Sequence, residues 1–118
     1  MKTAYLIISL LISALILGGC STKKPPTDRI ASAELAINLA EENKARDFAE
    51  LDLYKAKENL QNAKNAVAKD DYEEAARYAD QALIDAQLAQ EKAQAAMAGE
   101  AADDLRKSTD TLVDELNR

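Results

Sequence analysis

The chain has 118 residues, a single cysteine, no histidine and a formal net charge of −6 at pH 7. This acidic balance, without a basic binding face, argues against a nucleic-acid partner. Strong helix formers such as alanine, glutamate, lysine and leucine predominate, and β-branched residues are few in the part that follows the N-terminal segment. We therefore expect an all-α protein with one small helical domain.

The N-terminal segment has the pattern of a secretory signal peptide. Lys2 precedes an apolar run from Ala4 to Leu17, and small residues follow it. The run is shorter than the roughly 20 apolar residues that a membrane helix needs, which favours a leader that is cut off. Residues 1–19 are the predicted signal peptide.

The residues Leu17-Gly18-Gly19-Cys20 make this prediction more specific. They resemble the lipobox of bacterial lipoproteins, whose cysteine receives a diacylglycerol thioether before the leader is removed and the new amine is acylated. The resemblance implies that Leu17, Gly18 and Gly19 are recognised for cleavage and that Cys20 is the lipidation site. Two or more acyl chains would anchor the mature protein stably in a membrane. The alternative is an ordinary signal peptide followed by a chance cysteine.

Residues 20–27 form the predicted anchor and spacer, which Pro25 and Pro26 keep extended. Ser21, directly after the cysteine, resembles the pattern of lipoproteins that are sorted to the outer membrane in cells with two membranes. We therefore expect a protein anchored in the cell outer membrane with its domain facing the periplasm. Loss of Lys2 with the leader would change the formal charge to −7.

The helical domain is predicted over residues 28–98. Thr27 is the expected cap of the first helix, with Asp28 in its first turn. One apolar stripe of this helix consists of Ile30, Ala33, Ile37 and Ala40, whereas Leu35 and Leu39 lie on another side. The pattern restarts out of phase near residue 46, which predicts a helix boundary there. A single bent helix over residues 28–68 is the alternative.

The second helix is expected to begin at a capping box from Asp47 to Glu50. Its apolar stripe consists of Ala49, Leu53, Ala56, Leu60, Ala63 and Val67. A polar turn and a second capping box, Asp71 to Glu74, predict the start of a third helix, for which Gly99 is the expected C-terminal stop. The short connection and the alanine-rich stripes predict an antiparallel hairpin. Leu60 and Leu83 are its expected large buried contacts.

The C-terminal tail, residues 99–118, has Leu105, Leu112 and Leu116 at helical spacing among charged residues. It is predicted to be helical, either as a fourth, loosely docked helix or as a segment that binds a partner. The fold prediction is thus a short bundle of about three helices with a possible fourth.

Three segments in order, residues 31–37, 53–60 and 71–83, resemble the bacterial family called domain of unknown function 4398. The resemblance implies an envelope lipoprotein or an exported protein, and no established activity comes with it. Some members of the family carry a downstream OmpA-like domain that binds peptidoglycan. Because this chain stops at Arg118, we do not expect that function here.

The sequence predicts no catalytic, cofactor-binding or metal site. It lacks histidine, and its one thiol is the predicted lipid attachment point. Adjacent acids such as Glu41-Glu42 and Asp103-Asp104 diverge by about 100° around a helix, so the members of a pair do not converge on one ion. An enzyme is therefore not expected.

The leading hypothesis is a membrane-tethered, non-enzymatic interaction or structural module with a protein partner in the cell envelope. One alternative is a binding or chaperone-like module that holds a peptide or a lipid in an opened hairpin. Another is a coiled-coil spacer similar to the murein lipoprotein. A non-covalent contact with peptidoglycan and the oligomeric state stay open.

Overall fold

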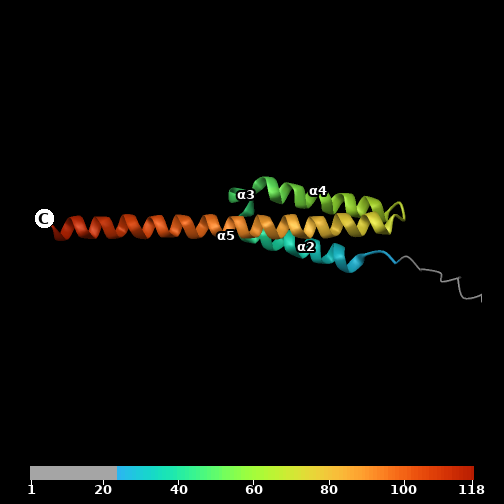
Figure 1. Ribbon diagram of the computed structural model, residues 1–118, viewed down its shortest axis with the longest axis horizontal. Coiled ribbons are helices and arrows are strands. Elements are labelled where there is room, and N and C mark those ends of the chain that lie inside the picture. Colours follow the sequence, from blue (N-terminus) through green and yellow to red (C-terminus); the bar gives the residue numbers. More distant parts are fainter. Residues whose placement is uncertain (1–23) are drawn as a thin grey trace, which may run out of the picture.

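The computed structural model describes residues 24–118, and all regular structure in this part of the chain is helical (Figure 1). The elements are α2 (Thr27–Glu42), the short α3 (Ala45–Phe48), α4 (Glu50–Val67) and α5 (Tyr72–Leu116). The all-α prediction is confirmed. Among these helices, none combines the length and the apolar character that crossing a membrane requires.

Helices α4 and α5 form the predicted antiparallel hairpin, and α2 packs against the same N-terminal half of α5 (Figure 1). Helix α2 also contacts α4, so that the three helices form a small bundle. The C-terminal half of α5 continues beyond this bundle with no other helix beside it. With 45 residues, α5 is by far the longest element, and at about 1.5 Å per residue it measures roughly 65–70 Å.

The start of α2 differs from the prediction by one residue. Thr27 was expected as the cap, but the cap position is occupied by Pro26, whose side chain can accept no hydrogen bond. The carbonyl oxygen of Pro26 accepts the first helical bond from the amide of Ile30 at 3.1 Å, so Thr27 already lies inside the helix. Asp28 lies in the first turn as predicted, where its charge complements the helix dipole.

The predicted boundary near residue 46 is confirmed, and a single helix over residues 28–68 is excluded. Helix α2 ends before Lys44, which has a left-handed backbone (φ 59°), and α3 and α4 follow. The predicted cap at Asp47 is wrong, because this residue lies within α3 and Ala49 precedes α4. Ala45 and Ala49 are both buried in the core. The packing of these two residues, and not a capping side chain, determines how the chain passes from α2 to α4.

The turn between α4 and α5 follows its predicted chemistry. An oxygen of Asp71 accepts a hydrogen bond from the amide of Glu74 at 3.2 Å, which confirms the predicted cap. Asp70 has a left-handed backbone (φ 58°), a conformation that aspartate tolerates better than most residues. The hydroxyl of Tyr72 donates to the Asp70 carboxylate at 2.8 Å, and this bond raises the pKa of Tyr72.

Gly99 does not end the last helix, contrary to the prediction. Helix α5 runs through it to Leu116, and Gly99 does not have the positive φ of a helix stop. A glycine inside a helix costs only about 1 kcal/mol relative to alanine, and the strong helix formers on both sides outweigh this cost. The tail is helical as predicted, but it is an extension of α5 and not a separate fourth helix.

The core of the bundle consists mainly of alanine, as the stripes of the sequence predict. The residues on its buried faces are Ala33, Ala36, Ile37, Ala40, Ala45, Ala49, Leu53, Ala56, Ala63, Ala66, Ala75, Ala79, Ala82, Ala86, Ala89 and Ala93. Small side chains let helix axes approach to about 8 Å. Leu60 and Leu83, the expected large buried contacts, do pack against this core, but they are only partly buried.

Candidate interaction surface

The predicted processing residues lie outside the part of the chain that the structure describes. These are Leu17, Gly18, Gly19, Cys20 and Ser21. Their roles in cleavage, lipidation and sorting stay predictions from the sequence.

The acidic side chains within residues 24–118 do not gather into a metal site. In this range no cluster of three or more His, Cys, Asp or Glu side chains could hold an ion. Instead, several carboxylates act in the fold, such as Asp71 in the cap of α5 and Glu34, which pairs with Lys64 at 2.6 Å across α2 and α4.

Shallow polar hollows occur on the surface of the hairpin. One of about 330 Å³ is lined by Asn59, Arg77, Tyr78 and Gln81. The interface between α4 and α5 is itself closed, because alanines such as Ala56 and Ala82 have no exposed surface. A pre-formed apolar cavity of the kind that holds small ligands is therefore not present along these two alanine stripes.

Two polar bridges join α4 to α5 beside the alanine core. Lys92 reaches the mostly buried carboxylate of Asp52 at 2.6 Å. Asn59 donates to Asp85 at 2.8 Å. Neither bridge is predictable from the sequence, because the partners lie far apart in the chain and come together only once the hairpin register is known. These bonds constrain that register, since a slip would leave partly buried polar groups without partners.

Glu41 links the end of α2 to α3 and α4. Its carboxylate accepts a bond from Lys57 and another from Arg46 at 2.8 Å. The hydrogen bond from Lys57, followed by that from Arg46, holds the pKa of Glu41 below its ordinary value of 4.5. The group thus stabilises the fold in its ionised form.

We expect Glu41→Gln to lower the free energy of unfolding by about 0.5–1 kcal/mol at pH 7, the size of a partly exposed ion pair. Because the folded-state pKa is lowered, the stabilisation is present above the unfolded pKa and is lost as the pH falls through the folded value. Urea titrations of both proteins between pH 2 and 7 should therefore converge at the acidic end. Glu42→Gln, at an exposed neighbour, is the matched control. A difference that stays constant over the whole range would contradict this assignment.

The most distinctive surface is a row of apolar side chains along the outside of α5. We call this row the outer row and define it by ten positions at alternating steps of four and three residues: 84, 88, 91, 95, 98, 102, 105, 109, 112 and 116. Its large members are Ile84 (57% exposed), Leu88 (43%), Leu105 (70%), Leu112 (65%) and Leu116 (86%). The smaller members are Ala95, Ala98 and Ala102, and the two polar ones are Glu91 and Thr109.

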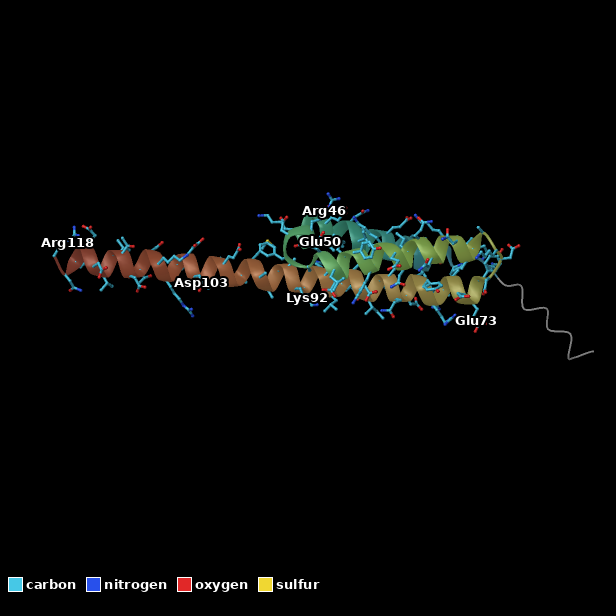
Figure 2. The ribbon with its side chains drawn as sticks, turned by 90° about the horizontal axis from the view of Figure 1, so that it is seen from above. Arg46, Glu50, Glu73, Lys92, Asp103 and Arg118 are labelled. Atoms are coloured by element: carbon cyan, nitrogen blue, oxygen red, sulfur yellow. The ribbon has the colours of Figure 1, made fainter. Side chains whose placement is uncertain are left out.

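The outer row lies on the face of α5 opposite the bundle. At about 100° per residue, its centre is roughly 160° around the helix axis from the buried alanines 75–93. Figure 2 shows the segment from Asp103 to Arg118 with side chains all round and no neighbouring helix. All residues from 98 onward are exposed. Sequence analysis identified the tail leucines but missed Ile84 and Leu88, because the buried stripe dominates the apolar pattern there.

A second exposed pair, Leu35 and Leu39, lies on α2. As predicted, these leucines are on a different side of the helix from the buried Ala33, Ile37 and Ala40. Two leucines one turn apart make a small patch, whereas the outer row is continuous over about nine turns of α5. The outer row is therefore the stronger candidate for an interaction surface.

Comparison with protein families gives a match over residues 28–105 to a family described as a domain of unknown function, DUF4398. The match contains the entire bundle and the first part of the exposed segment of α5. No curated protein and no solved structure gives a significant match. The family match covers well over half of the chain, so the protein belongs to the DUF4398 family.

Proposed function

We propose that the protein is a non-enzymatic, lipid-anchored module of the cell envelope that binds a protein partner through α5. The exposed segment of α5 carries this proposal. Leu105, Leu112 and Leu116 are each more than half exposed on the C-terminal segment of α5, which has no other helix beside it. Contiguous apolar surface of this kind marks interaction sites in soluble domains, and a helix with apolar anchors at such spacing typically docks against another helix or into a groove.

The sequence supports the location of this module. Leu17-Gly18-Gly19-Cys20 favours a lipid anchor at Cys20, and Ser21 favours the outer membrane with the bundle facing the periplasm. Helix α2 begins at Thr27, only a few residues after Cys20. The bundle would therefore lie close to the membrane that holds the anchor.

Replacement of Cys20 by serine is expected to abolish lipidation. Cells that express Cys20→Ser should incorporate no labelled palmitate into the protein and should accumulate an uncleaved or soluble product. Ser21→Asp is the matched control, because it keeps the cysteine and should keep the label while shifting the protein towards the inner membrane. Label and membrane fractionation that persist in Cys20→Ser would show that the anchor is elsewhere.

The interaction role is tested separately by a photo-crosslinking residue in the full chain in living cells. At Leu112 on the outer row it should capture a protein. At Leu51 on α4, which is 64% exposed and off the outer row, it should not. Equal capture at both positions, or none at Leu112, would contradict the proposed function.

A further inference from the structure

We propose that the outer row of α5 binds the outer row of a second copy of this chain in antiparallel orientation, so that the two form a symmetric dimer. The inference rests on the proposed interaction role and names the partner.

The spacing is that of a helix pair. Eight of the ten positions at steps of four and three residues from Ile84 to Leu116 are apolar, with Glu91 and Thr109 as the exceptions, and the steps correspond to the core positions of a heptad repeat. A single-sided amphipathic helix needs only the period of about 3.6 residues, whereas a sustained period of 3.5 keeps a narrow seam towards one partner helix. In the N-terminal half of α5, which packs in the bundle, the helix therefore has two apolar stripes: the buried alanines and this seam.

The register with a second copy is complementary when the two helices run antiparallel and cross near residue 100. The core layers then pair Ile84 with Leu116, Leu88 with Leu112, Ala95 with Leu105 and Ala98 with Ala102 of the second copy. The two polar positions, Glu91 and Thr109, fall opposite each other. A parallel pair in register would instead place Glu91 against Glu91, two like charges in the seam, which is unfavourable.

The bundle leaves room for this partner. Helices α2 and α4 pack on the face of α5 opposite the outer row, so the second copy meets no other helix. Each exposed tail then lies along the outside of the other copy's bundle. Leu112 and Leu116 of one chain cover Leu88 and Ile84 of the other. The second chain makes the same contacts with the first, as in an isologous two-fold interface. One contact thus accounts for both groups of exposed large side chains.

The charges beside the seam are balanced within each chain. The flanking positions carry two acids, Asp85 and Glu115, and two bases, Lys92 and Arg106. Lys92 and Arg106 lie near each other across the dimer, but each has an acid in its own chain, Asp52 at 2.6 Å and Asp103 at 3.5 Å respectively. The acidic excess of the segment lies on the faces away from the seam: Glu100, Asp103, Asp104, Asp110 and Asp114.

The size of the contact also suits a dimer. The outer row is roughly 50 Å long and a helix is about 10–12 Å wide, so each chain contributes about 500–600 Å². The total of about 1,000–1,200 Å² reaches the lower limit for a specific interface. We therefore expect a dimer that dissociates on dilution.

The first test uses the full chain, extracted from membranes in detergent and examined by sedimentation over a range of concentrations. Wild type should form dimers, and Leu112→Glu should raise the dissociation constant by about 100-fold or more, because two leucines are lost and each is worth at least about tenfold. Leu51→Glu is the control and should dimerise like wild type. Circular dichroism should show that Leu112→Glu keeps a folded helical bundle. A wild type that stays monomeric, or equal effects of both variants, would overturn the inference.

The second test establishes the orientation with cysteines introduced into the full chain. A mixture of Ile84→Cys and Leu116→Cys chains should form a disulfide between chains, because these positions face each other within bonding distance. Leu105→Cys alone should not, since its copies lie about ten residues apart along the seam. The unsubstituted chain controls for Cys20. The opposite pattern would show a parallel pair and overturn the antiparallel arrangement.

The photo-crosslink at Leu112 separates this inference from the proposed function. Capture of a second copy supports both. Capture of a different protein without any second copy overturns the dimer and leaves the interaction role standing. No capture at Leu112 overturns both.

Discussion

Replacement of Leu53 by alanine should lower the free energy of unfolding by about 2–4 kcal/mol, the usual cost of removing a buried leucine side chain. Leu53 is only 3% exposed and is one of the few large residues in a core made mainly of alanine. The neighbouring helices cannot collapse far into the space that it leaves, because their contacts are already short alanine contacts. A small domain has only about 5–15 kcal/mol in total, so the loss would be a large fraction of its stability.

The control for this prediction is Leu51→Ala. Leu51 is two residues away on the same helix but is 64% exposed, and surface substitutions of this kind usually change stability by less than about 0.5 kcal/mol. Urea denaturation of the wild type and both variants measures the difference. Equal midpoints for the two variants would mean that α4 does not present Leu53 to the bundle.

Enlargement of Ala86 to leucine is expected to destabilise the bundle by about 1–3 kcal/mol or more, for the opposite physical reason. Ala86 has no exposed surface and belongs to the same core cluster as Leu53. A larger side chain at this position must push apart helices that alanine allows to lie close together. The variant distinguishes the effect of close packing from that of hydrophobicity, because it adds apolar surface and is still expected to lose stability.

Thermal melting followed by circular dichroism would measure the effect of Ala86→Leu. Ala31→Leu, at an exposed position of α2, is the control and should leave the transition nearly unchanged. If Ala86→Leu melted at the same temperature as wild type or higher, the close approach of α5 to the other helices would be wrong.

The sequence predicted the helices and their buried faces well because both depend on local information. The stripe alanines Ala49, Ala56 and Ala63 and the cap at Asp71 are properties of neighbouring residues, and the structure confirms them. The family resemblance, carried by three short segments, is confirmed over residues 28–105.

The errors arose where two local signals compete or where distant residues decide. At Gly99 a stop signal competes with strong helix formers on both sides, and the helix continues. At Asp47 a capping pattern competes with the burial of Ala45 and Ala49, and burial decides. Leu60 and Leu83 were expected to be the large buried contacts because of their size, but Leu53 is more deeply buried because it belongs to the cluster that α2, α4 and α5 share.

The candidate surface was only partly predictable. The tail leucines stand out among charged residues, whereas Ile84 and Leu88 have meaning only when the opposite face of the same helix is known to be occupied. Bridges such as Lys92 with Asp52 depend on the hairpin register, which no short pattern in the chain specifies.

The uninterrupted course of α5 gives one helix two very different levels of protection against unwinding. Its first half is held by the bundle, while the turns beyond Gly99 are held only by bonds within the helix itself. The bundle supplies the costly nucleus, so these turns form by propagation alone, and the glycine weakens the point where they begin. Their amide protons should therefore exchange with solvent through local fraying long before the bundle opens. A partner on the outer row would stop this fraying, and part of its binding free energy would be used to order the helix. Residue 99 would then influence the affinity through the stability of the helix.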